Sequence, residues 1–361
     1  MVCWAQQDYV ARSLCKTMPM KSMKERMAKG LATALLLPAL WLAGCQHGAT
    51  GAKDNPAHQG SPLTVLRFEQ LMFGVTPSQL QDTLRKTATL YGGTLLNVRP
   101  NDPAYMAQLA GMAQDATCRE LYDSVARHFA DLKWLGQEMA HALRRTRALG
   151  DSTPAPKVVT FISGQLDYVH RAAANESSVL IALDQYVTPC FKKYGYFQLP
   201  SYLVALSTPA HMLPDAVAAL ARQHIAWPQG EPTLLDYMVA EGKVQYYLRR
   251  ALPKCHDTLL LRYNASQWEW ARAHASDAWA YWIQRDLLFE QDYNEIFNFI
   301  EDAPKTNAFG DSAPRMTDYV GWQIVEAYME GHPCPLQQLL ETSDARKILR
   351  ESGWKPERKR R

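Results

Sequence analysis

The chain has 361 residues, of which 47% are hydrophobic and 21% are charged, which is the composition of an ordinary globular protein. Residues 1–44 carry six Lys or Arg and two Asp or Glu, so the remaining residues hold 33 basic and 34 acidic side chains, a net charge of −1. A chain with this balance offers no basic face large enough for nucleic acid, so we expect no nucleic-acid partner. The length suits one large domain or two small ones.

A basic segment followed by an apolar one lies near the N-terminus. Four basic residues between 21 and 29 precede the apolar run 31–42, LATALLLPALWL, which is too short for a membrane span of about 20 residues. This order is typical of a secretory signal peptide. The sequence Leu42-Ala43-Gly44-Cys45 resembles the lipobox of bacterial lipoproteins. The resemblance implies cleavage before Cys45 and attachment of lipid to that residue, which makes 23–44 a lipoprotein signal peptide.

The segments around this signal are expected to lie outside the folded domain. Residues 1–22 extend unusually far upstream, and several later methionines offer alternative starts, so we interpret 1–22 as an over-predicted start. Residues 45–61 contain few bulky apolar side chains and are predicted to be a flexible tether. Gln46 follows the cysteine, and by resemblance to lipoproteins this favours the outer membrane. The last residues, 356–361, are predicted to be a solvated basic tail.

Between these ends the pattern predicts a mostly α-helical α+β fold, a single domain over 63–355. Apolar residues recur at helical spacing in ten segments, bounded by Gly and Pro. These segments are 77–91, 103–112, 118–129, 131–149, 213–225, 233–251, 266–289, 293–300, 317–330 and 343–352. Residues 157–163 and 178–183 are rich in β-branched and apolar side chains, so they are predicted to be strands of a small sheet.

Metal-ligand patterns are sparse in this region. Glu138 and His141 have the spacing of carboxylate-bridged metal sites, but a second copy is absent, so we interpret them as a surface ion pair. Four tryptophans between 268 and 282 share one predicted helix, where such density indicates packing in the core. We expect no metal and no cofactor.

The cysteines leave two interpretations open. Cys118, Cys190, Cys255 and Cys334 lie in the predicted domain. An oxidising compartment permits disulfides, and four cysteines allow three pairings. A domain of this size needs no disulfide, so buried free thiols are equally compatible with the sequence.

The segment 234–250, LLDYMVAEGKVQYYLRR, draws attention because Gly242 interrupts a predicted helix. A glycine there costs about 1 kcal/mol relative to alanine. Either another backbone approaches closely at this point, or a site lies beside Glu241. Spacing alone favours a solvated pair of Glu241 and Lys243 on an exposed face.

Several segments resemble a known family when taken together and in order. They are VLIALDQYV (179–187), LPSYLVALSTPAHMLPDAVAAL (199–220), MVAEGKVQYYLRRALP (238–253), ASQWEWARAHASDAWAYWI (265–283) and YVGWQIVEAYM (319–329). They are similar to the gliding-motility lipoprotein GldB family, over about 63–355. The family in turn resembles zinc metallopeptidases of the zincin type, so a degenerate zincin-like domain is the expected fold.

The resemblance to zincins locates a candidate site. In that fold one helix carries His-Glu-x-x-His and a later helix supplies a glutamate, often followed by Gly. Glu241 matches the later glutamate, and Asp215 occupies the place of the general base in Pro214-Asp215-Ala216-Val217-Ala218. Both histidines are missing, and one carboxylate without imidazoles cannot hold Zn²⁺ in a tetrahedral site. His211 is expected to approach the site from a loop.

Lys243 and Tyr246 complete the candidate residues. We expect the Lys243 ammonium to replace the charge of the lost metal by pairing with Asp215 or with Asp184 at the end of a strand. A hydrolase with an unorthodox site around Asp215, Glu241, Lys243 and Tyr246 is the alternative function. The favoured function is a non-catalytic, lipid-anchored envelope protein. By resemblance, it acts in a gliding or secretion machinery, with membrane contact through Cys45 and envelope proteins as partners.

Overall fold

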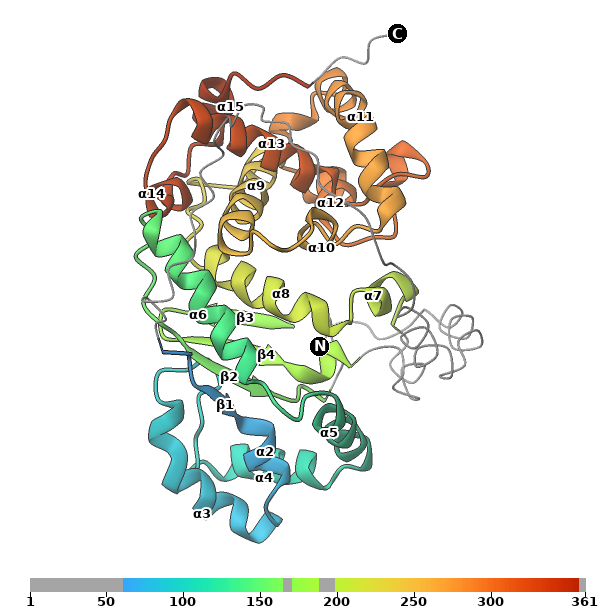
Figure 1. The fold of residues 1–361 in the computed structure, drawn as a ribbon. Helices are drawn as coiled ribbons and strands as arrows, with labels where there is room; N and C mark the ends of the chain where they lie inside the picture. The colour runs from blue at the N-terminus through green and yellow to red at the C-terminus, as the bar shows by residue number, and fades with distance from the viewer. Residues whose placement is uncertain (1–60, 165–170, 188–198, 357–361) are drawn as a thin grey trace, which may run out of the picture.

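The computed structural model describes residues 61–164, 171–187 and 199–356 (Figure 1). Cys45, the signal peptide, Cys190 and most of the tail lie outside the described residues. The mostly helical α+β fold is confirmed. The zincin-like architecture stays a prediction.

The sheet has four strands in the order β1-β2-β4-β3. Their bounds are β1 Val65–Arg67, β2 Lys157–Phe161, β3 Ala172–Asn175 and β4 Ser178–Ala182. β1, β2 and β4 run parallel, with Val158 opposite Val179 in the central pair, and β3 returns antiparallel beside β4. β4 is buried along its whole length, as expected for a strand covered on both faces.

Helices cover both faces of this sheet (Figure 1). On one side lie α2 Phe68–Phe73, α3 Pro77–Thr87, α4 Pro103–Gln114 and α5 Ala116–His128, with the 3₁₀ turn η2 Ala88–Tyr91. On the other side lie α6 Lys133–Ala148 and α8 Pro209–Arg222, which packs on β3 and β4. The 3₁₀ turn η4 Leu183–Tyr186 and the short helix α7 Ser201–Ala205 precede α8.

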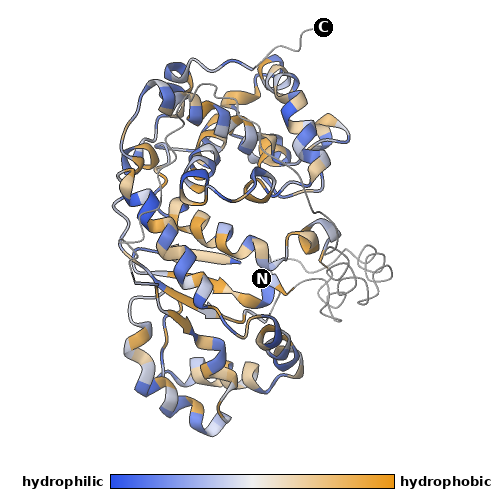
Figure 2. Ribbon diagram, viewed as in Figure 1, coloured by the Kyte–Doolittle hydropathy of each residue, from blue (hydrophilic) through white to orange (hydrophobic). Residues whose placement is uncertain are grey.

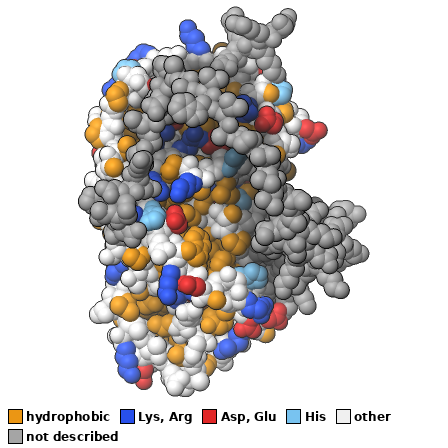
Figure 3. Space-filling view, viewed as in Figure 1, with side chains coloured by type: hydrophobic (Ala, Val, Ile, Leu, Met, Phe, Trp, Pro, Cys, Tyr) orange, Lys and Arg blue, Asp and Glu red, His pale blue; other side chains and the backbone are white. Residues whose placement is uncertain are grey.

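The second half of the chain packs beyond α8 and forms the upper part of Figure 1. Its helices are α9 Leu234–Ala251, α10 Asp257–Leu260, α11 Ala265–Gln284, α12 Tyr293–Ile300, α13 Met316–Gly331, α14 Leu336–Glu341 and α15 Ala345–Ser352, with 3₁₀ turns η6 Leu287–Phe289 and η7 Asn307–Phe309. Apolar residues concentrate on the strands and on the inner helices (Figure 2). On the face shown in Figure 3, charged side chains of both signs lie mixed among apolar ones.

Most predicted helices are present, with corrections at their ends. The helix predicted over 213–225 begins earlier, at Pro209, because a proline suits the first helical position. Pro214 is accommodated inside the helix instead of starting it. β1 and β3 were not predicted: β1 has three residues, and β3 is alanine-rich and depends on pairing with β4.

Other expectations meet the structure directly. Glu138 and His141 form an exposed pair, with the carboxylate 3.6 Å from Nδ1, which confirms the surface interpretation. Trp282 is fully buried and its three helix-mates pack partly against the core. Cys118, Cys255 and Cys334 are free thiols, so no disulfide joins these three.

α9 is the central helix of the second half, and its sequence explains both ends. Thr233 caps its N-terminus: the Thr233 Oγ1 accepts from the Asp236 amide at 3.3 Å, and the Asp236 carboxylate accepts from the Thr233 amide at 2.8 Å. The helix ends at Ala251, two residues before Pro253. Almost all of its middle is buried, with α6, α8 and α13 among the helices around it.

Gly242 permits α9 to cross α13 closely. A Cβ at Gly242 would lie 2.3 Å from the backbone carbonyl atoms of Gly321, and a Cβ at Gly321 would lie 1.8 Å from the Met238 carbonyl oxygen. Two glycines therefore face each other, and their backbones are in contact. Of the two alternatives for this glycine, the close approach of another backbone is observed. The solvated pair of Glu241 and Lys243 that spacing favoured is wrong, because Lys243 is buried.

Gly242→Ala should destabilise the protein by about 1–3 kcal/mol, because the added methyl must push the two helices apart. Urea unfolding measures the change in free energy. Gly111→Ala is the matched control: Gly111 is also helical but has open space around its Cβ position. The control should be neutral or stabilising by up to about 1 kcal/mol. Equal effects of the two substitutions would contradict the close crossing.

Candidate functional site

Glu241 lies on α9 and faces the end of α8, where Arg222 holds it. The Arg222 Nε and Nη2 donate to the two carboxylate oxygens at 3.1 and 2.8 Å, which is a bidentate pair. Burial opposes ionisation of Glu241, but the Arg222 guanidinium outweighs it and holds the pKa of the carboxyl below its ordinary value. The carboxylate is therefore charged and already fully paired.

The Arg222 and Glu241 side chains are both accessible to solvent, although the helices that carry them are largely buried. Between 238 and 248, Glu241 is the single residue of α9 that is not buried, and its side chain is 28% exposed. The Arg222 side chain is 40% exposed, although α8 is buried from residue 211 to residue 221. The pair therefore lines a solvent-accessible spot between two buried helices.

Asp215 lies on α8, is more deeply buried than Glu241, and is held by different partners. The Tyr186 hydroxyl donates to Asp215 Oδ2 at 3.0 Å, and the Arg262 Nη2 donates to Oδ1. Burial raises the pKa of Asp215, but Arg262 and Arg171 lower it more, so it ends below the ordinary value. Tyr186 belongs to the Leu-Asp-x-Tyr segment after β4, which explains how the end of the sheet meets α8.

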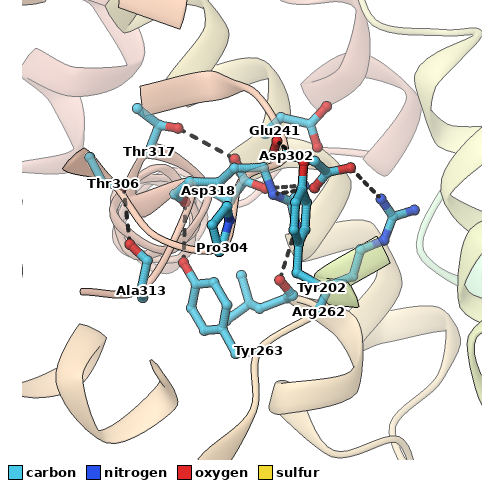
Figure 4. A network of polar contacts seen from close by, with 12 residues as sticks. Tyr202, Glu241, Arg262, Tyr263, Asp302, Pro304, Thr306, Ala313, Thr317 and Asp318 are labelled. Carbon is cyan, nitrogen blue, oxygen red and sulfur yellow. Dashed lines mark hydrogen bonds and ion pairs between the residues drawn. The ribbon is translucent and has the colours of Figure 1, made fainter. Parts of the chain in front are cut away.

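Arg262 connects Asp215 to a second group of charges. Figure 4 shows Arg262 beside Asp302 of this group. Its Nη1 lies 3.7 Å from Asp302, and Asp302 in turn lies 3.0 Å from the Arg315 Nε. Arg315 reaches Asp318 one helical turn onward at 3.0 Å. Burial and the charge of Glu241 raise the pKa of Asp318 to about 7, against the opposing effect of Arg315.

These side chains form what we call the arginine–carboxylate network. Its members are Arg171, Arg222, Arg262, Arg315, Asp215, Glu241, Asp302 and Asp318. Arginines and carboxylates are equal in number, so most of their charge is compensated, although Asp318, with its pKa of about 7, is partly protonated at neutral pH. Buried charges are tolerated when they are paired in this way, and removing one member leaves its partner uncompensated.

His211 lies on α8 itself, one turn before Asp215, and not in a loop as expected. It is buried, and its Nδ1 lies 2.8 Å from the Thr208 hydroxyl. Burial lowers its pKa to about 4, so the ring is neutral at pH 7. His224 contacts Thr153 instead, at 3.0 Å. Within 61–164, 171–187 and 199–356, no three His, Cys, Asp or Glu side chains are grouped as metal ligands.

Lys243 does not join the network, and the expected pairing with Asp215 or Asp184 is wrong. Its buried ammonium donates to the carbonyl oxygens of Leu340, at 3.5 Å, and Thr342. Residues two apart on a helix point about 200° apart, which sends Lys243 to the side of α9 opposite Glu241. Burial lowers its pKa to about 8. Lys243 therefore secures the end of α14.

Asp184 and Tyr246 also have structural partners. Asp184 accepts from the Ser163 amide and hydroxyl at 3.0 and 2.7 Å and from the Gly164 amide at 3.0 Å, which ties the loop after β2 to the end of β4. Tyr246 is buried, with the Arg250 guanidinium 4.4 Å from its ring centroid. The candidates Asp215, Glu241, Lys243 and Tyr246 therefore do not converge on one site.

The arginines are the members that the sequence interpretation missed. A search for metal ligands gives no weight to Arg222, Arg262 or Arg315. One observation would have pointed to them: a carboxylate on a buried helix needs a cation when no metal is held. The sequence spacing does not show which arginine pairs with a given carboxylate, because partners such as Arg262 and Asp215 are far apart in the sequence.

The fold and the site define an α+β protein, mostly helical, whose central carboxylates are neutralised by arginines. The family model described as gliding motility protein GldB matches residues 52–356, and the chain belongs to this family. The curated proteins and the solved structures that were compared contain no match. Among the described residues, no helix has the length and apolar character of a membrane span.

Arg222 and Glu241 should be coupled by about 1 kcal/mol in a double-mutant cycle of single and paired alanine variants, because their contact is bidentate and half-buried. The exposed pair of Arg272 and Glu269, 3.5 Å apart, is the matched control and should show coupling near zero. The pKa of Glu241 lies below 4.5 in the folded state. The coupling is therefore complete above pH 4.5 and is lost as the pH falls below it. Equal coupling energies in the two pairs would contradict the assignment of Arg222 and Glu241 as a bidentate, half-buried ion pair.

Lys243 should add a contribution to the free energy of unfolding that rises between pH 8 and 9.5, seen as the difference between wild type and Lys243→Met. The folded protein releases this proton near pH 8, whereas the unfolded chain keeps it to about 10.5, so the unfolded state binds more protons in this window. The rise is at most about 1.4 kcal/mol per pH unit. Urea unfolding at several pH values measures it, and Lys243→Met should abolish it. Buried thiols such as Cys118, whose pKa is raised by burial, contribute a slope of the opposite sign in wild type and variant alike. A wild-type minus Lys243→Met difference that is flat or falls with pH would be the contrary result.

Proposed function

We propose that this protein is a lipid-anchored envelope protein that acts without catalysis in the assembly or support of a gliding or secretion machinery. Membership of the GldB family supports the gliding role and the envelope location. The lipobox ending at Cys45 supports a lipid anchor, and Gln46 supports the outer membrane. Its partners in this role are other envelope proteins.

The observation that carries the non-catalytic role is the bidentate grip of Arg222 on Glu241. A catalytic zinc takes three protein ligands and keeps one position for water. Here the carboxylate that would correspond to the third ligand is already held by a guanidinium. A second guanidinium, that of Arg262, holds Asp215. Two fixed positive charges replace the charge of a metal and oppose the entry of Zn²⁺.

The same arrangement makes Asp215, the residue in the place of the general base, a poor base. A base that activates water must accept a proton near neutral pH. Arg262 and Arg171 keep the pKa of Asp215 below its ordinary value, and the Tyr186 hydroxyl occupies one of its oxygens. Asp215 therefore has little tendency to take a proton. The alternative hydrolase also loses Lys243 and Tyr246, which face other elements.

Purified full-length protein should contain less than about one tenth of an equivalent of zinc after dialysis against zinc and then buffer, measured by plasma mass spectrometry. Arg222→Ala should stay equally low, because the histidines are still missing. Stoichiometric zinc that is lost in Glu241→Ala would overturn the non-catalytic proposal.

In cells, Cys45→Ser should release the protein from the membrane fraction. It should also abolish the gliding or secretion that depends on the protein, which is the phenotype to be measured. Glu241→Gln should keep that phenotype wherever immunoblots show normal protein levels, because the carboxylate has a structural partner and no catalytic role. Loss of the phenotype in Glu241→Gln at normal protein level and normal thermal stability would favour the hydrolase.

A further inference from the structure

α12 turns aromatic side chains toward solvent. This helix buries Ile296 and Phe299 against the core, as a surface helix should. Its outer side carries Tyr293 and Phe297, which are 49% and 41% exposed, where polar residues are usual. Trp227, in the loop before α9, is also 45% exposed. Exposed aromatic residues that gather at one place often mark a binding surface.

Two ring pairs make up this place, which we call the aromatic surface. Trp227 meets the half-buried Tyr237 edge to face, with centroids 5.3 Å apart, and Tyr293 stacks on Phe297 at 6.4 Å. The Tyr293 hydroxyl donates to Glu301 at 2.7 Å. Burial, followed by nearby carboxylates that include Glu301, raises the pKa of Tyr237. Both ring pairs therefore lie near one carboxylate.

The loop and the helix also lie side by side. The Gln291 side-chain amide donates to the Glu231 backbone carbonyl at 2.8 Å, and the Leu234 amide donates to the Glu290 carbonyl at 3.0 Å. These bonds join the segment before α9 to the segment before α12. The aromatic surface is therefore built on a connected piece of backbone, and it does not depend on a mobile loop tip.

The charge of these two segments has one sign. Residues 225–240 and 286–304 contain eight Asp or Glu and no Lys or Arg, and of the eight only Asp302 belongs to the arginine–carboxylate network. Glu231, Glu295 and Glu301 are exposed, and no cation of the described chain forms an ion pair with them. Arg285 and Lys305 flank the second segment, and Arg346 lies over the Phe289 ring at 4.2 Å, so these cations border the surface.

We propose that the aromatic surface binds a Lys- and Arg-rich segment of a partner protein. Cations are attracted to the faces of Trp, Tyr and Phe rings and to the surrounding carboxylates at the same time. An anionic lipid surface would be repelled by these carboxylates. The inference extends the proposed function by naming the chemistry of the partner, and it does not depend on the state of the arginine–carboxylate network.

The test measures binding of a fluorescein-labelled peptide of three Lys-Gly-Arg-Gly repeats to the full-length protein in detergent by fluorescence anisotropy. A Glu-Gly peptide of equal length is the control ligand. Trp227→Ser combined with Phe297→Ser, and Glu231→Lys combined with Glu295→Lys, alter the surface without touching the core. Leu95→Ser and Glu176→Lys are matched exposed controls on the other half of the molecule.

The basic peptide should bind, and each surface variant should raise its Kd about tenfold, since a few residues carry most of the energy of such contacts. Added salt should weaken binding. The two controls should leave the Kd unchanged, and the Glu-Gly peptide should not bind. Absence of binding, or equal losses in the controls, would overturn the proposal. Flotation of the Cys45→Ser chain with phosphatidylglycerol vesicles would also overturn it, if Trp227→Ser combined with Phe297→Ser abolishes the flotation. Dimerisation that the same double variant abolishes would overturn it as well.

Discussion

The pairing of arginines with carboxylates between α8, α9 and α13 is the interaction on which the centre of this protein depends. A buried carboxylate without a partner is costly, and its removal from water is offset only by a cation or by several hydrogen bonds. Glu241, Asp215 and Asp302 each meet an arginine, and Arg262 serves two of them. Guanidinium groups therefore surround these carboxylates, and the pairs join segments that are far apart in the sequence.

This network requires the helices to be held at short distances, which the glycine crossing achieves. Because Gly242 and Gly321 bring the backbones of α9 and α13 into contact, Glu241 is carried toward the charges at the start of α13. The neighbouring Lys243 points away and binds the end of α14. One short run of sequence, Glu241-Gly242-Lys243, thus contributes to three different contacts. Each of its members has its own structural partner, and Glu241 and Lys243 face different helices.

Much of the architecture was predictable because it is local. Helical periodicity placed most long helices to within a few residues, and the β-branched runs located β2 and β4. The predictions failed where local preference is weak. β3 is alanine-rich, so only its hydrogen bonds with β4 make it a strand, and α8 begins four residues earlier than its expected start. A close backbone at Gly242 was one of two alternatives that the sequence left open, and the contact with Gly321 selects it.

The sequence by itself determined most of the long helices, the central strands, the resemblance to a lipobox and the absence of a His-Glu-x-x-His motif. Each of these is carried by residues within a few positions of one another. The tertiary structure alone decided the partners of the charges: Arg222 for Glu241, Arg262 for Asp215, and backbone carbonyls for Lys243. These pairs join residues 19, 47 and about 99 positions apart. No local preference selects one arginine over another at such separations. The packing of whole helices makes that choice, because it determines which cation can reach each buried carboxylate.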